Sequence, residues 1–221
     1  MVKPILGYWN KRGRVEPIRY LLHHKNVDFE DKRYIFGQDE WKKVKFTLGF
    51  DFPNLPYYID GDTKLTQSVA ILRYLGGKYD LDGKDDQQKL RINVAEQQSI
   101  DFREALRRFV NREDYDSARD EFIKTTIPAM FKMWEKFLGD RKYLAGDDIT
   151  YVDFMVYENL DFYRLFHAKT FDNFPTLKSY HSRIKDLPGV QKYLNSSSFR
   201  QWPIFNPQAK FGGGGEEPKQ A

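Results

Sequence analysis

The feature that most constrains the fold is a change in hydrophobic period near residue 85. Upstream, short runs of strand-forming residues alternate with apolar residues at helical spacing; downstream, almost every segment has a helical period. Residues 80–88 are polar and charged, so we place a linker at residues 83–89. The pattern predicts an α+β fold, with a small α/β domain over residues 1–82 and an all-α domain over residues 90–211.

Local signals give the order of elements in the first domain as β-α-β followed by β-β-α. Asp60-Gly61 lies between two strand-like runs and predicts a hairpin. Ser68 stands where a helix N-cap is expected. In the second domain, Thr150 with Asp153 forms a capping-box pattern that predicts a helix start. Residues 212–221 are Gly-rich and then polar, and we expect a flexible tail there.

Composition excludes several classes of protein. The chain has no cysteine, so it can form no disulfide framework, zinc-thiolate site or cysteine nucleophile. Its net charge of +4 comes from well-mixed acids and bases, which does not indicate a nucleic-acid partner. It has no signal-like segment and no apolar run of the ~20 residues that a membrane span needs. We therefore expect a cytoplasmic protein with neither nucleic acid nor membrane as partner.

A small α/β unit followed by a helical bundle matches a thioredoxin-like domain joined to an all-helical domain. The motifs are more specific: PILGYW at residues 4–9, PIR at 17–19, KFxLGxDFPNLPY at 45–57, LTQSxAIxRY at 65–74 and TYVDF at 150–154. With these motifs the chain resembles mu-class glutathione S-transferases of the kind found in flatworms and mites. The resemblance covers nearly the whole chain.

The resemblance makes Tyr8 the catalytic residue, whose hydroxyl donates a hydrogen bond to the sulfur of glutathione. Without it, a tyrosine on a first strand would be taken as a half-buried aromatic. The thiolate stabilised in this way attacks an electrophilic carbon. Glutathione is a substrate, so the resemblance implies no cofactor and no metal.

Further residues are predicted to hold glutathione. Pro56 is expected to be cis, which would expose the main chain of Leu55 to the ligand, with Asn54 reaching the same molecule. Gln67 and Ser68 would bind the γ-glutamyl carboxylate, a role compatible with a simple helix cap. The glycine end would lie against residues of two short segments, and the γ-glutamyl amine would meet a residue of the partner subunit. These are Trp9, Trp41 and Lys45 for the glycine end and Asp101 for the amine.

The resemblance also implies a homodimer and a second-substrate pocket. Phe52 would insert into the partner, and Arg73 would lie near the two-fold axis. The pocket residues are predicted to be Val15, Arg103, Arg107, Asn111 and Phe205. Asn111 stands near the position where the family often has a tyrosine that assists electrophiles, so that assistance is not expected. Arg103 and Arg107 indicate either anionic co-substrates or a solvated helix face, and we favour the solvated face.

Three functions fit these residues. The first is conjugation of glutathione to small electrophilic, hydrophobic compounds in detoxification. The second is a glutathione-dependent isomerase, for example of prostaglandins, which would share the chemistry of Tyr8. The third is a carrier of lipid-like or haem-like anions without turnover. An intact Tyr8 and a full set of glutathione contacts favour the transferase.

Overall fold

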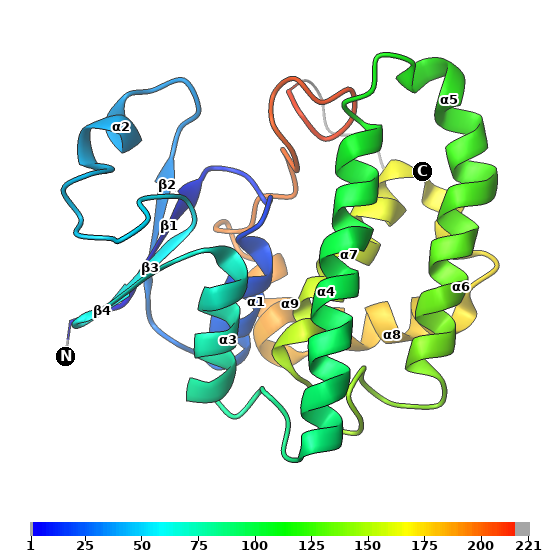
Figure 1. Ribbon diagram of the computed structural model, residues 1–221, viewed down its shortest axis with the longest axis horizontal. Helices are drawn as coiled ribbons and strands as arrows, with labels where there is room; N and C mark the ends of the chain where they lie inside the picture. The colour runs from blue at the N-terminus through cyan, green and yellow to red at the C-terminus, as the bar shows by residue number, and fades with distance from the viewer. Residues whose placement is uncertain (1, 215–221) are drawn as a thin grey trace.

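The computed structural model describes residues 2–214 and has two parts (Figure 1). The first is a four-stranded sheet with three helices, and the second is entirely helical, as predicted. Within residues 2–214, no helix combines the length and apolarity that a membrane span requires. The residues predicted as a tail from 215 to 221 lie outside the described residues.

The sheet has the order β2-β1-β3-β4. β1 runs parallel to β2 and antiparallel to β3, and β3 and β4 form an antiparallel hairpin. The hairpin turns at Gly61, whose φ of +59° suits glycine, so the predicted Asp60-Gly61 turn is confirmed. The strands are β1 (Ile5–Trp9), β2 (Glu30–Tyr34), β3 (Tyr57–Asp60) and β4 (Thr63–Thr66).

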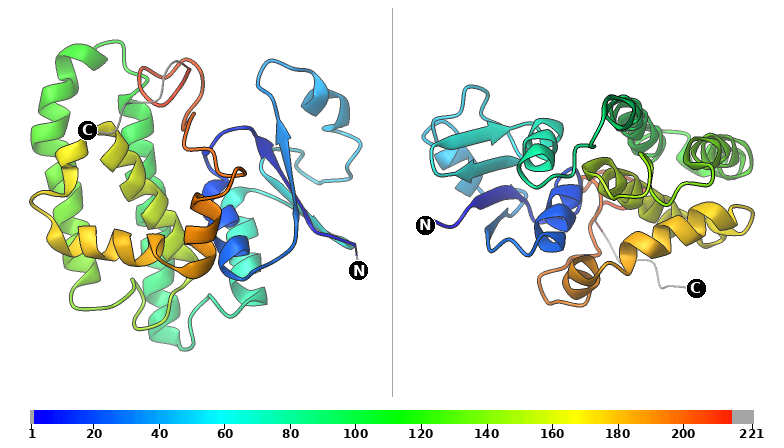
Figure 2. Two further views of the ribbon diagram at one scale, coloured as in Figure 1. Left: turned by 180° about the vertical axis from the view of Figure 1, so that it is seen from behind. Right: turned by 90° about the horizontal axis from the view of Figure 1, so that it is seen from below.

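Successive residues of a strand point to opposite faces of the sheet, and this separates the helices. Tyr57 packs on Trp41 of α2 (Glu40–Val44), with ring centroids 6.0 Å apart, whereas Tyr58 packs on Tyr74 of α3 (Ser68–Lys78) at 6.2 Å. The helix α1 (Glu16–His24) contacts α3. Consequently α1 and α3 lie between the sheet and the helical part, and α2 lies on the other face (Figure 2).

The helical part begins with α4, the longest helix of residues 2–214, which packs against α7; α8 in turn packs against α7, and α9 against α1 (Figure 1). The predicted helix over residues 117–138 is present but contains a π-helical segment that ends just before Pro128. Proline has no N–H for the helical ladder, so a local change of hydrogen bonding there is expected. The helices are α4 (Asp86–Phe109), α5 (Tyr115–Glu121), η1 (Phe122–Thr126), α6 (Ile127–Leu138), α7 (Tyr151–Phe166), η2 (Ala168–Phe171), α8 (Pro175–Lys185) and α9 (Pro188–Leu194).

The start of α7 is fixed by the predicted capping box of Thr150 and Asp153. The carboxylate of Asp153 is fully buried and accepts from the Thr150 N–H at 2.7 Å. It also accepts from the Leu144 N–H at 2.9 Å and the Tyr180 hydroxyl at 2.8 Å. One side chain thus connects the start of α7 to α8 and to the turn before α7.

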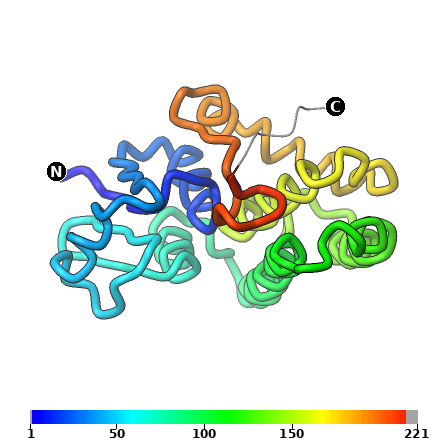
Figure 3. The backbone as a smooth tube through the Cα atoms, turned by 90° about the horizontal axis from the view of Figure 1, so that it is seen from above, coloured from blue at the N-terminus to red at the C-terminus, as the bar shows by residue number. Residues whose placement is uncertain are grey.

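The C-terminal segment returns to the boundary between the two parts (Figure 3). The carbonyl of Gly212 accepts from the N–H groups of Ile204 and Phe205, and Gly213 is buried. The predicted flexible tail therefore begins too early in the sequence, because residues 212–214 fold back on residues 204–209.

Candidate active site

Tyr8 lies at the boundary between the two parts of the molecule. It follows Gly7, the position on β1 that faces the ring of Tyr57, so Tyr8 itself points to the opposite face, toward the helices. Its side chain is 5% exposed, and its hydroxyl oxygen accepts the main-chain N–H of Arg14 at 3.3 Å. No acceptor among residues 2–214 takes the hydroxyl proton. The hydroxyl is thus free to donate to a bound group.

Gly13 makes this close approach of loop and hydroxyl possible. Its φ is +53°, in the left-handed region. A Cβ atom at this position would lie 2.8 Å from the Tyr8 hydroxyl oxygen, closer than van der Waals contact allows. Only glycine therefore fits beside Tyr8 here.

The loop that carries Gly13 and Arg14 is anchored on both sides. The guanidinium of Arg12 is fully buried and pairs with Glu158 and Asp161 of α7; its Nε lies 3.0 Å from Glu158 Oε1. The N–H groups of Arg12 and Gly13 donate to the C-terminal segment, at the carbonyls of residues 203 and 204. The segment beside the loop is visible in Figure 3. These contacts fix the donor that orients Tyr8.

The Tyr8 side chain lines a cavity of about 180 Å³ between the loop, α4 and the C-terminal segment. Four residues predicted for the second-substrate pocket line it: Arg103, Arg107, Asn111 and Phe205. Four further lining residues were not predicted from the sequence: Lys11, Arg14, Ile204 and Asn206. Lys11 and Arg14 belong to a basic loop that follows Tyr8 directly in the sequence. That proximity could have predicted them as residues of the site.

The interpretation of Arg103 and Arg107 as a solvated face is wrong for Arg103, whereas Arg107 lines the cavity and keeps 41% of its side chain exposed. Both line the cavity, and the Arg103 side chain is only 14% exposed. They flank Glu104, whose carboxylate lies 2.5 Å from Arg107 Nε and 3.4 Å from Arg103 Nη1. Arg14 of the loop reaches the same carboxylate at 2.8 Å. In the sequence, the spacing of these charged residues is that of a solvent-exposed helix face. The loop of Arg14, which lies over them, is distant in the chain.

Burial and mutual repulsion shift the pKa values of the cavity's cations. Burial lowers the pKa of Lys11 to about 8, assisted by the charges of Arg103 and Arg14. Burial and Arg14 also lower the pKa of Arg103, to about 10. Burial opposes ionisation of Glu104, but its hydrogen bond from Arg107 and the nearby arginines lower its pKa overall. The cavity thus holds four cationic side chains near two carboxylates, Glu104 and Glu158, of which Glu158 already pairs with Arg12.

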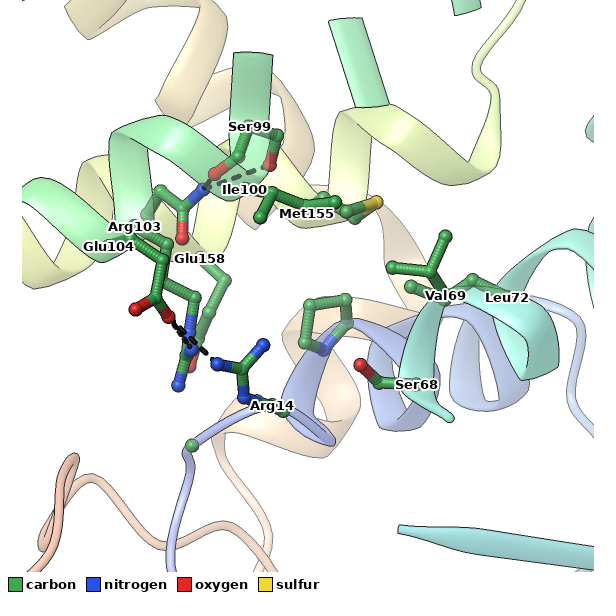
Figure 4. Close-up of a pocket in the computed structure, with 13 residues that line it drawn as sticks. Arg14, Ser68, Val69, Leu72, Ser99, Ile100, Arg103, Glu104, Met155 and Glu158 are labelled. Atoms are coloured by element: carbon green, nitrogen blue, oxygen red, sulfur yellow. Dashed lines mark hydrogen bonds and ion pairs between the residues drawn. The ribbon is translucent and has the colours of Figure 1, made fainter. Parts of the chain in front are cut away.

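A smaller cavity, of about 40 Å³, adjoins the first and shares Arg14 and Arg103 with it. Figure 4 shows Ser68 of α3 and Arg14 on one side of it and Glu104 of α4 on the other. Ser68 is the first helical residue, and the N-cap is Gln67, so the prediction of Ser68 as N-cap is wrong. Gln67 has a φ of +71°, which is unusual for a residue other than glycine. Such conformations cluster at functional sites.

The segment Asn54-Leu55-Pro56 precedes β3. The Leu55-Pro56 bond is cis, as predicted. The Leu55 N–H donates to Asn54 Oδ1 at 2.9 Å. A ligand that takes this N–H must displace the Asn54 side chain, which would then be free to bind the same ligand.

The residues predicted for the glycine end lie at the sheet and at α2. Trp41 is largely buried against the rings of Tyr34 and Tyr57, so it has little surface left for a ligand. Trp9 ends β1 and is half-buried, and Lys45 is half-buried at the end of α2. None of these three residues is part of the lining of the two cavities described above.

The predicted dimer residues lie on the surface. Phe52 is 75% exposed, and its carbonyl accepts the Thr66 hydroxyl at 2.9 Å, which holds its loop to β4. Arg73 pairs with the buried Glu96 of α4, at 2.7 Å from Nε to Oε2. Asp101 is exposed on α4. Val15, predicted for the second-substrate pocket, is instead fully buried in the core, so that prediction is wrong.

Two family models match the chain. The model described as "Glutathione S-transferase, N-terminal domain" matches residues 4–77, and that described as "Glutathione S-transferase, C-terminal domain" matches residues 100–197. Together they span both parts of the fold.

Named relatives are similar over nearly their full length. The chain is 46% identical over 218 residues to a glutathione S-transferase of Dermatophagoides pteronyssinus, covering 96% of this chain and 98% of the relative. It is 41% identical over 216 residues to the glutathione S-transferase class-mu 26 kDa isozyme 51 of Fasciola hepatica, with coverages of 96% and 98%. Among solved structures, the glutathione S-transferase Blo t 8 superposes with a TM-score of 0.84 at 36% identity, covering 94% of this chain and 99% of that one.

Proposed function

Because this chain belongs to the mu class of the glutathione S-transferase family, we propose that Tyr8 activates the thiol of glutathione for conjugation to electrophilic compounds. The observation that carries the role of Tyr8 is its hydroxyl group. The oxygen accepts the Arg14 N–H at 3.3 Å, and the side chain lines the cavity. The proton is then available to a sulfur atom placed there.

The chemical need for such a donor follows from the pKa of a thiol. At a pKa near ~8.5, only a few per cent of a free thiol is ionised at pH 7. A hydrogen bond to the sulfur favours the thiolate, and each pKa unit corresponds to about 1.4 kcal/mol. Tyr8 acts as a donor and does not itself need to ionise.

The remaining glutathione contacts are proposed from the resemblance of the sequence motifs to the family. The main chain of Leu55, freed from Asn54, would pair with the cysteinyl part. Ser68 and the N-terminus of α3 would bind the γ-glutamyl carboxylate, because free N–H groups and the helix dipole favour an anion there. Gln67, at its unusual φ of +71°, would present its main chain to the same group. Pro56 would keep Leu55 in position.

Trp9, Trp41 and Lys45 are proposed for the glycine end, where the ammonium of Lys45 would face the terminal carboxylate. The reaction as proposed uses no cofactor and no metal, since glutathione is itself a substrate. A cytoplasmic location stays a prediction from the sequence.

We further propose a homodimer whose sites are completed in trans. Asp101 is exposed on α4, two residues before the cavity residue Arg103, and would reach the γ-glutamyl amine bound by the partner. Phe52 offers an exposed aromatic ring that a partner could cover. Arg73, half-exposed and held by Glu96, would lie at the interface.

The isomerase and carrier alternatives are not favoured, because the relatives and solved structures above are named as transferases. The test is turnover of 1-chloro-2,4-dinitrobenzene with glutathione by the purified protein. We expect conjugation that saturates with glutathione. Glutathione binding without turnover of this or any related electrophile would contradict the transferase function and support the carrier.

A further inference from the structure

Among residues 2–214, the cavity at Tyr8 is lined by four cationic side chains and by no acidic one. They come from the loop after β1 and from α4: Lys11, Arg14, Arg103 and Arg107. The nearest carboxylate that pairs with them is Glu104, which lines the adjoining small cavity. Three arginines share it. The second-substrate cavity therefore carries a net positive charge.

Within the described part of the chain, two of these cationic side chains lack a full set of hydrogen-bond partners or a counter-charge. Arg103 Nε is buried and has no hydrogen-bond partner. Lys11 is 9% exposed and has Asn206 Oδ1, a neutral acceptor, as its hydrogen-bond partner at 2.5 Å. Burying a charge without a counter-charge is unfavourable, and the lowered pKa values of Lys11 and Arg103 report the same cost. A bound anion would remove the free-energy cost of these buried, unpaired positive charges.

The rest of the cavity wall is partly apolar and partly neutral polar, and its size admits a ring. Ile204 and Phe205 supply apolar surface, and Asn111 and Asn206 supply neutral polar groups. A cavity of about 150 Å³ can hold a benzene ring, so about 180 Å³ is of the right order for a substituted ring. The cavity wall is thus mostly polar and cationic, with a smaller apolar part at Ile204 and Phe205, beside the Tyr8 side chain.

We propose that this transferase prefers electrophiles that carry an anionic group, such as a carboxylate, which the cations of the cavity bind while the thiolate attacks. The proposal rests on the proposed function and specifies its substrate class. In the reaction, the glutathione sulfur forms a bond to the electrophilic carbon, and the leaving group departs with the bonding electron pair. For a chloroarene, chloride leaves, and the thiol proton passes to solvent. The anionic group takes no part in bond making.

The test compares 4-chloro-3,5-dinitrobenzoate with 4-chloro-3,5-dinitrobenzamide, which have the same reacting ring and differ in charge. For each, kcat/KM is divided by the rate constant of the uncatalysed reaction with glutathione. We expect the benzoate-to-benzamide ratio of these values to exceed one by about tenfold, as one charged hydrogen bond of ~1.5–3 kcal/mol would give. The ratio should fall toward one as ionic strength rises.

Arg107→Gln should lower this ratio by about tenfold, and Arg107→Lys should restore most of it. Arg107 is chosen because Glu104 keeps Arg14 as a partner in its absence, so folding should be preserved. Arg108→Gln is the matched control, since Arg108 is the exposed neighbour on α4 and does not line the cavity. It should leave the ratio unchanged.

Two results would overturn the proposal: a wild-type ratio near one, or a ratio that Arg107→Gln does not change because both substrates lose activity equally or not at all. Equal losses would mean that the cations assist the reaction itself. Turnover of the benzamide shows in each case that the transferase function stands. Absence of glutathione-dependent turnover with both compounds and with 1-chloro-2,4-dinitrobenzene would instead contradict the proposed function.

Discussion

The main-chain N–H of Arg14 donates a hydrogen bond to the hydroxyl oxygen of Tyr8, 3.3 Å away, while the Arg14 side chain pairs with Glu104 of α4 at 2.8 Å. One residue therefore orients the proposed sulfur donor and ties its loop to the helical part. The position of Tyr8 depends on the packing of both parts of the fold, and not on β1 alone.

Gly13→Ala should disturb Tyr8 specifically. The new Cβ would lie 2.8 Å from the Tyr8 hydroxyl oxygen. We expect kcat/KM for 1-chloro-2,4-dinitrobenzene to fall about tenfold or more, measured beside thermal unfolding. Gly61→Ala is a matched control, because Gly61 has a similar φ of +59° with nothing within 4 Å of the new Cβ. Gly61→Ala should lose about 1 kcal/mol of stability from its backbone conformation alone, and Gly13→Ala at least as much. An equal loss of activity in the two variants would contradict the role of Gly13.

Tyr8→Phe removes the hydroxyl and keeps the ring. A hydrogen bond to a charged group contributes ~1.5–3 kcal/mol, so the pKa of enzyme-bound glutathione should rise by about 1–2 units. Ultraviolet difference absorbance of the thiolate against pH measures this shift, and kcat/KM near pH 6.5 should fall about 10- to 100-fold. Tyr79→Phe, at the other end of α3 from Ser68, is the control. Retention of both the thiolate and the turnover by Tyr8→Phe would contradict its role as donor.

Local signals in the sequence predicted those elements whose determinants are close in the chain. The hairpin at Asp60-Gly61 and the capping box of Thr150 and Asp153 depend on two to four residues each. The change in hydrophobic period near residue 85 predicted the two-part fold, and the resemblance supplied the importance of Tyr8. No local sequence pattern predicted that Gln67, the N-cap residue of α3, has a positive φ.

The cationic cavity could not be predicted in the same way. It is assembled from the loop after β1, the middle of α4 and the C-terminal segment, which are distant in sequence. In the sequence, Arg103 and Arg107 near Glu104 have the spacing of a solvated helix face. Their place in a cavity follows from the loop of Lys11 and Arg14, which lines the same cavity and is held by the ion pairs of Arg12 with α7.

Asp153→Ala should destabilise the helical part. It removes the acceptor for Thr150, Leu144 and Tyr180, and each buried donor left without a partner costs about 1–3 kcal/mol. We expect a loss of about 3 kcal/mol in the free energy of unfolding, measured in urea. Asp148→Ala is the control, because Asp148 is 62% exposed and only pairs with Lys84 at the surface. A loss below about 1 kcal/mol for Asp153→Ala would contradict this account.

Phe52→Ala should weaken the proposed homodimer. Truncating an aromatic anchor at an interface costs about 2 kcal/mol or more, which raises the dissociation constant at least about 30-fold. Sedimentation velocity over a range of concentrations measures the change. Phe46→Ala is the matched control, because Phe46 is 78% exposed and precedes the same loop. A dimer unchanged by Phe52→Ala, or a wild-type monomer, would contradict the proposal.

The preference for anionic electrophiles should depend on pH through Lys11, whose pKa is lowered to about 8 by burial, Arg103 and Arg14. Lys11 is charged below that pH and neutral above it, so the benzoate-to-benzamide ratio should fall as pH rises from 7 to 9. Ionisation of the glutathione thiol affects both substrates and cancels in the ratio. The other groups facing Lys11 are the Tyr8 ring, at 6.0 Å from its Nζ, and the neutral amide of Asn206. Lys11→Gln should have a lower ratio that stays constant over this range. A wild-type ratio that did not change between pH 7 and 9 would contradict a contribution from Lys11.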